Sequence, residues 1–202
     1  MNDLMNLLGE IDELAKPKVL DDGFLPYSNK GETDFIPDIL PQNITLRGYQ
    51  MAAVETILKF RRGILGFAPG MGKTPTALTA IANIGGRTLI VIPPSLAYDP
   101  WKKEIEKLFP QIKFQIVSGQ KPYAIDNDTQ IVICGDSVIS FWVNELIQWK
   151  PTTLVVDEAQ RHKNRKAKRA AACQHRLLEL PNQLLVQHHI TSGVTLGVSC
   201  RT

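Results

Sequence analysis

The chain has 202 residues, of which 44% are hydrophobic and 21% are charged, and its formal net charge is +3. A chain of this length can bury a core, and we expect one α/β domain of about 150 residues with extensions. No stretch approaches the roughly 18 apolar residues of a membrane span, and the acidic residues close to Met1 exclude a secretory signal.

The three cysteines (Cys134, Cys173 and Cys200) lie far apart, and the four histidines lack the spacing of a metal site. We therefore expect buried or free thiols in a reducing compartment and no structural metal. That compartment would be the cytoplasm for a bacterial or phage protein and the nucleus for a eukaryotic one.

Residues 1–45 differ in composition and residue pattern from the rest of the chain. Leucine and isoleucine recur at helical spacing over residues 2–15, which predicts a short amphipathic helix. Residues 16–45 carry four prolines and two glycines. This composition predicts a lead-in segment that is extended or poorly ordered, and not a separate domain.

Residues 46–186 are predicted to form alternating helices and strands. Helices are expected over 47–60, 75–83, 100–109, 138–148 and 166–179, and strands over 64–67, 87–92, 113–117, 130–134, 153–156 and 184–186. Asp99 is expected to cap its helix, with Pro100 in the first position. Strands that alternate with helices indicate βαβ units around a parallel sheet, so the predicted fold class is α/β.

One segment of this region has the composition of a phosphate-binding loop. The apolar run 64–67 leads into Gly70-Met71-Gly72-Lys73-Thr74, and a helix-like run follows. The glycines let backbone N–H groups approach a phosphate, Lys73 would reach its oxygens, and the Thr74 hydroxyl would hold Mg²⁺. Phe67 stands where the full motif has its first glycine. Because strand, glycine turn and helix occur together, we favour a nucleotide site over a structural turn.

Two carboxylates, Asp157 and Glu158, follow the apolar run 153–156. An acid at the end of a strand can hold Mg²⁺, and a neighbouring carboxylate can orient an attacking water. Ligands bind at the carboxyl ends of parallel strands, so we expect these acids and the glycine loop to share one rim of the sheet. The alternative is that the two acids begin a turn or cap the next helix.

Four motifs occur in order within about residues 46–180. They are Leu46-Arg47-Gly48-Tyr49-Gln50, then Ala68 through Thr74, then Val91 through Leu96 with Trp101, then Val155 through Gln160 with Lys163-Asn164. Together they resemble the superfamily 2 helicase-like ATPases, and within them the Swi/Snf-type (DEAD/DEAH-box-like) double-stranded DNA translocases. The resemblance implies a three-layer RecA-like P-loop domain with a mostly parallel central sheet. It also implies the N-terminal lobe of an enzyme that hydrolyses ATP to move along DNA.

The same resemblance implies roles for individual residues. Gln50 would read the adenine, and Gly70, Met71, Gly72, Lys73 and Thr74 would bind the phosphates of ATP. Thr74 and Asp157 would hold Mg²⁺, and Lys73, Asp157 and Glu158 would be catalytic. Pro94, Ser95 and Leu96 would contact the phosphates of double-stranded DNA, and Gly135–Ser137 loosely resembles a further DNA-contacting motif. A second RecA-like lobe would complete the site.

The chain departs from the family in three respects. Gln160 replaces the histidine of the D-E-A-H motif, and we expect this change to be tolerated because an amide still hydrogen-bonds across a cleft. The motif that couples the ATP and DNA sites does not follow residues 184–186, so we predict that residues 187–202 are a disordered or frameshifted tail. The 202 residues include one lobe, so we expect weak ATP hydrolysis and no movement along DNA by this chain alone.

Two other interpretations stay open. The chain can be a non-catalytic nucleotide- or DNA-binding module, or an unrelated P-loop kinase or transferase. The second of these would make the other three motifs coincidences. Residues 161–169 hold six lysines and arginines and no acid, and they are either a solvated surface or a DNA contact.

Overall fold

The protein, seen as a computed structural model, is built on a parallel sheet, and the structure describes residues 33–93, 98–157 and 180–186. The described strands are β1 (Arg62–Leu65), β2 (Thr88–Ile92), β3 (Phe114–Val117), β4 (Ile131–Gly135), β5 (Thr153–Asp157) and β6 (Asn182–Val186). The described helices are α2 (Gly48–Phe60), α3 (Lys73–Ile84), α4 (Asp99–Leu108), the 3₁₀ turn η1 (Ile139–Phe141) and α5 (Val143–Trp149). The predicted α/β fold class is confirmed.

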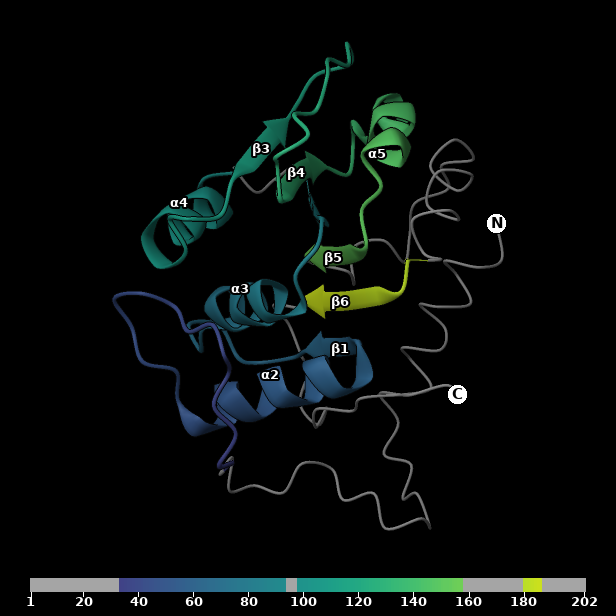
Figure 1. Ribbon diagram of the computed structural model, residues 1–202. Coiled ribbons are helices and arrows are strands. Elements are labelled where there is room, and N and C mark those ends of the chain that lie inside the picture. The colour runs from purple at the N-terminus through teal and green to yellow at the C-terminus, as the bar shows by residue number, and fades with distance from the viewer. Residues whose placement is uncertain (1–32, 94–97, 158–179, 187–202) are drawn as a thin grey trace.

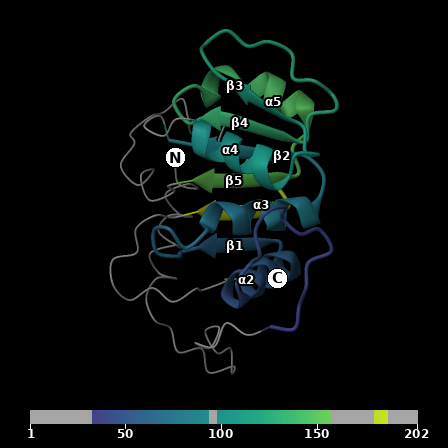
Figure 2. The same cartoon turned by 90° about the vertical axis from the view of Figure 1, so that its left-hand side faces the viewer.

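The strand order of the sheet is β1-β6-β5-β2-β4-β3, and every neighbouring pair is parallel (Figures 1 and 2). The last strand therefore lies between the first strand and β5. Its register places Val186 opposite both Leu65 of β1 and Asp157 of β5. The carboxyl ends of these three strands consequently form one continuous rim.

Alternate side chains of the strands face two separate hydrophobic clusters. Ile90 and Ile133 belong to the cluster formed with α2, α3 and α4, whereas Leu89 and Val132 belong to the cluster formed with α5. In Figure 2 the first three helices lie over the near face of the sheet. This alternation explains the continuous apolar runs of the central strands: β2 and β4 are covered on both faces of the parallel sheet, and all of their residues are buried.

Several element boundaries differ from the prediction, and three of the differences have a structural cause. The first strand is Arg62–Leu65 and stops before Phe67, because its pairing with β6 ends at Leu65. Tyr98, and not Asp99, is the N-cap residue of α4, so the predicted Asp99 cap is wrong; the Asp99 carboxylate instead pairs with Lys103 one turn on. The helix expected over 138–148 is split into η1 and α5 at Trp142. This tryptophan is fully buried and donates its indole N–H to the carbonyl of Gly119, and that contact fixes the chain between the two pieces.

The described end of the lead-in, residues 33–45, contains no helix or strand but is bonded to the domain. The Ile39 backbone N–H donates to Asn83 Oδ1 (2.9 Å), and Asn83 Nδ2 donates back to the Ile39 carbonyl (2.8 Å). The Gln42 N–H donates to the carbonyl of Leu108 at the end of α4 (2.8 Å). These residues therefore run as an extended strap across α3 and α4. The helix predicted over 2–15, the helix predicted over 166–179 and the tail at 187–202 lie outside the described residues.

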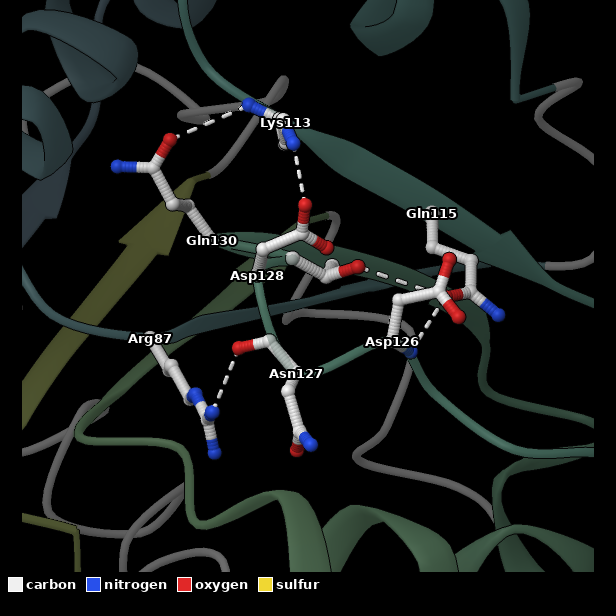
Figure 3. Close-up of polar contacts among 8 residues, drawn as sticks. Arg87, Lys113, Gln115, Asp126, Asn127, Asp128 and Gln130 are labelled. Atoms are coloured by element: carbon white, nitrogen blue, oxygen red, sulfur yellow. Dashed lines mark hydrogen bonds and ion pairs between the residues drawn. The ribbon is translucent and has the colours of Figure 1, made fainter.

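A network of polar side chains connects the amino ends of β2, β3 and β4, at the end of the sheet opposite the carboxyl rim (Figure 3). Arg87 donates to the carbonyl of Asn127 (2.8 Å), and Lys113 forms an ion pair with Asp128. That hydrogen-bonded pairing raises the pKa of Lys113 and lowers the pKa of Asp128. Gln130 Oε1 accepts the backbone N–H of Lys113 (3.2 Å). The contacts hold the amino ends of the strands and leave the carboxyl rim to the candidate site.

None of the described helices combines the length and the apolar character that crossing a membrane would require.

Candidate nucleotide-binding site

The glycine loop connects β1 to α3 at the carboxyl rim. Gly70 and Gly72 both have positive φ (77° and 76°), a conformation that glycine adopts without the steric penalty of a Cβ. The N–H of Met71 donates to the carbonyl of Ala68 (3.2 Å), which closes the turn. Phe67 is buried, and its ring packs edge-on against Tyr49 with 5.2 Å between centroids. Phe67 therefore anchors the loop by packing, at the position where the full motif has a glycine.

Lys73 is the first residue of α3, and its side chain turns back over the loop. It is only 5% exposed, and its ammonium donates to the carbonyls of Phe67 (2.6 Å) and Ala68 (3.1 Å). The first-turn N–H groups of a helix have no intrahelical acceptor and carry the positive end of the helix dipole. The loop amides, the start of α3 and the ammonium thus form a site with the charge and the donors that an anion needs. Thr74, half-buried, is the next residue of the helix.

Two side chains from the first turn of α2 hold the loop in place. Gln50 Oε1 accepts the Arg47 backbone N–H (2.8 Å), while Gln50 Nε2 donates to the carbonyls of Met71 (3.2 Å) and Gly72 (3.4 Å). The Tyr49 hydroxyl also donates to the Met71 carbonyl (3.0 Å). A Cβ added at Gly72 would overlap the Gln50 amide nitrogen, so the second glycine is required for this contact as well as for its φ. Adenine recognition by Gln50 stays a prediction, and the structure adds a second role that the sequence did not reveal.

Asp157 is the last residue of β5, on the same rim as the loop. Because β6 separates β5 from β1 and neighbouring strands lie about 4.8 Å apart, Asp157 and Leu65 at the loop's origin are roughly 10 Å apart. The carboxylate is buried, and its Oδ2 accepts the indole N–H of Trp101 on α4 (2.9 Å). The sequence suggested Trp101 only as part of a motif; its contact with an acid 56 positions away came from the fold.

The end of β4 lies beside the end of β2 on this rim. The N–H of Asp136 donates to the carbonyl of Ile92 (2.8 Å), and the Tyr98 hydroxyl lies against Gly135. Burial raises the pKa of Tyr98 above its ordinary value. The predicted DNA-contacting turn that begins at Gly135 therefore shares the rim with the glycine loop.

Several predicted site residues lie outside the described residues. They are Glu158, the DNA-contacting Pro94, Ser95 and Leu96, and the basic run 161–169. Of the predicted site residues that the structure describes, it brings Gln50, the glycine loop, Lys73, Thr74 and Asp157 to one rim.

The residues at the rim suit a magnesium ion by the chemistry of their donors. Mg²⁺ prefers carboxylate and hydroxyl oxygens and is usually held by one or two protein ligands, with phosphates and waters completing the shell. Asp157 and Thr74 would supply one oxygen ligand of each kind. The described residues hold no cluster of three or more His, Cys, Asp or Glu side chains. A pair of protein ligands beside a phosphate site fits Mg²⁺ bound together with a nucleotide.

A parallel sheet with a glycine loop after one strand and an acid at the end of a nearby strand defines an α/β domain of the P-loop class. The fold matches the SWI2/SNF2 ATPase core of Sulfolobus solfataricus, solved in complex with dsDNA, with a TM-score of 0.63 and 20% identity over 77% of this chain and 34% of that one. Residues 28–187 match the model of the SNF2-related domain. The chain belongs to this family, which confirms the resemblance to Swi/Snf-type proteins and the RecA-like fold.

Curated relatives have similar segments. The DNA 3'-5' translocase XPB2 of Sulfurisphaera tokodaii is 39% identical over 69 residues, which are 34% of this chain and 16% of that protein. An uncharacterized ATP-dependent helicase of Mycoplasma pneumoniae is 30% identical over 136 residues, which cover 59% of this chain and 13% of that protein. The chain thus matches only a small part of the length of each.

Proposed function

We propose that this chain is the ATP-binding lobe of a DNA-dependent ATPase that moves along double-stranded DNA. One observation carries the proposal: in a chain of the SNF2-related family, the glycine loop with Lys73 follows β1 and the buried carboxylate of Asp157 ends β5, at one rim of the sheet with only β6 between them. Residues 46–186 would form the lobe, with residues 1–45 as its lead-in. The reaction is hydrolysis of ATP to ADP and phosphate.

Different residues of the rim would bind different parts of Mg-ATP. The ammonium of Lys73 would exchange the Phe67 and Ala68 carbonyls for phosphate oxygens, joined by the N–H groups at the start of α3. Thr74 and Asp157 would hold Mg²⁺, which neutralises charge on the phosphates when it is bound. Glu158 would orient the attacking water from its position next to Asp157.

DNA binding by this chain is supported by the rim and by the relatives. The solved SWI2/SNF2 core carries double-stranded DNA, and the S. tokodaii relative is named a DNA translocase. We propose that Pro94, Ser95 and Leu96 meet DNA phosphates next to the turn at Gly135. Contacts to phosphates fix position without reading sequence, so the chain would bind duplexes of any sequence.

The site that we propose contains two acids, Asp157 and Glu158, and one lysine, Lys73, and the acids would not offset the negative charge on the transferring phosphoryl group. An arginine supplied by a partner is worth on the order of 10³–10⁵ in rate for this chemistry. We therefore propose that the chain binds ATP well and hydrolyses it slowly until a second lobe supplies that charge. Opening and closing of two lobes on DNA would provide movement.

The test is steady-state ATP hydrolysis by residues 1–202 with saturating duplex DNA, alone and with a separately produced second lobe of a relative. The proposal predicts turnover well below ~1 s⁻¹ for the chain alone, the low end of typical enzyme rates. Added second lobe should raise turnover, and Glu158→Gln should abolish the increase. Nucleotide binding without turnover in every arm would show a non-catalytic module instead.

A further inference from the structure

The buried contact between Trp101 and Asp157 is not explained by packing alone. Trp101 is the third residue of α4 and only 2% exposed, and Asp157 is 4% exposed. The indole Nε1 and the carboxylate Oδ2 are 2.9 Å apart. A buried carboxylate is costly unless donors satisfy it, and a hydrogen bond to a charged acceptor is stronger than one between neutral groups.

A second buried tryptophan shows what an ordinary structural contact looks like in this fold. Trp142 is fully buried in the cluster on the other face of the sheet, and its indole N–H donates to the backbone carbonyl of Gly119 (3.0 Å). Buried indoles usually find some acceptor, so the bond of Trp142 requires no further role. Trp101 differs because its acceptor is the side chain of Asp157, the acid that we propose holds the cation.

The chemistry of an indole suits a carboxylate that must also bind a cation. An indole N–H is a donor only and carries no net charge, so it orients the carboxylate without repelling a metal ion. A lysine or arginine in the same place would add a positive charge next to the cation. Carboxylates that bind metals are commonly held by such neutral or backbone donors, and losing that partner typically weakens metal binding 10–100-fold.

The fold fixes both ends of the contact. Asp157 ends β5, which pairs with β2 on one side and β6 on the other. Trp101 lies in the first turn of α4, a helix held to the sheet by Ile105 and Leu108, which are fully buried. Rotation of the carboxylate therefore requires either a broken bond to the indole or a movement of the start of α4.

We propose that Trp101 is a positioning residue for Asp157: its indole N–H holds the carboxylate in the orientation that binds Mg²⁺ together with ATP. The inference rests on the proposed function, in which Asp157 holds the cation. It adds that the start of α4 responds to occupation of the metal site, because a shift of the carboxylate changes the hydrogen bond of the indole.

The experiment compares Trp101→Phe with the matched control Trp142→Phe, since each removes one buried indole hydrogen bond. Calorimetry measures the affinity for a non-hydrolysable ATP analogue in Mg²⁺ and in EDTA. We expect Trp101→Phe to weaken binding 10–100-fold in Mg²⁺ and less than about twofold in EDTA. Trp142→Phe should change neither affinity. A loss of equal size in both conditions, or no loss in Mg²⁺, would overturn the inference.

A second measurement needs no substitution in the core. The chain has three tryptophans, so ¹H–¹⁵N spectra of the wild type contain three indole resonances. Magnesium with the analogue should shift the Trp101 indole resonance more than the analogue in EDTA does, and should leave that of Trp142 in place. An unchanged Trp101 resonance beside tight Mg²⁺-dependent binding overturns the inference and leaves the proposed function standing. Absence of any Mg²⁺-dependent binding by the wild type overturns both.

Discussion

Replacing Gln50 by alanine tests whether α2 holds the glycine loop. The substitution removes one bond to the Arg47 N–H at 2.8 Å and a shared donor to the carbonyls of Met71 and Gly72 at 3.2 and 3.4 Å. A net hydrogen bond contributes about 0.5–1.5 kcal/mol. Counting the shared donor once, and allowing water to reach the Arg47 N–H, we expect a loss of about 1–2 kcal/mol in the free energy of unfolding.

Gln50→Glu removes the donor to the loop carbonyls and keeps the acceptor for the Arg47 N–H. The glutamate keeps an acceptor for the Arg47 N–H but places an oxygen, and no donor, against the two loop carbonyls. Urea denaturation should therefore show both variants less stable than the wild type, with unchanged m-values. Unfolding free energies within about 0.3 kcal/mol of the wild type, together with a lost preference for ATP over GTP analogues, would show that Gln50 only reads the base.

Three further predictions concern the loop, the core thiol and DNA. Gly72→Ala should cost at least about 1–2 kcal/mol of stability, because Gly72 lies in the left-handed region (φ 76°, ψ 39°) and the added Cβ would also displace the Gln50 amide; a variant as stable as the wild type in urea denaturation would refute this. Burial raises the pKa of the Cys134 thiol from 9.0 to about 12. The neutral thiol therefore stabilises the fold fully below pH 9, and this stability falls as the pH rises from 9 toward 12, by about 1.4 kcal/mol per pH unit. A chain with the other two cysteines changed to serine should resist native alkylation at pH 8 and react rapidly in urea; rapid native alkylation would contradict the burial. Duplex DNA affinity should fall linearly on a logarithmic salt scale and not depend on sequence, as fluorescence anisotropy with unrelated duplexes can measure; a salt-independent affinity would refute binding through phosphates.

The sequence predicted the fold class well because local signals agreed with the global arrangement. Each predicted strand within the described residues exists, since a parallel sheet covered on both faces leaves uninterrupted apolar runs such as 88–92 and 131–135. The position of β6 between β1 and β5 had no local signal. Strand order depends on long-range pairing. The apolar pattern of residues 184–186 would predict a strand equally well at an edge of the sheet.

Contacts between distant residues account for what the sequence could not show at the site. The hydrogen bond from Trp101 to Asp157 joins residues that are 56 positions apart. The hydrogen bond from Gln50 to the Met71 carbonyl joins residues that are 21 positions apart. A motif identifies such side chains as candidates for ligand binding, whereas their bonds to each other depend on how α2 and α4 pack on the sheet. The break in the helix at Trp142 has the same cause, because a tertiary contact overrode helical periodicity.

Calorimetric titration with a non-hydrolysable ATP analogue tests whether Lys73 and the glycine loop bind the phosphates of Mg-ATP. In the structure the Lys73 ammonium is bonded to the carbonyls of Phe67 and Ala68, which phosphate oxygens would replace. We expect a single Mg²⁺-dependent binding event for the wild type and an affinity at least tenfold weaker for Lys73→Ala, which is a difference of about 1.4 kcal/mol or more. Circular dichroism should show that the variant remains folded. Equal affinities of the two folded proteins would show that Lys73 does not bind the phosphates.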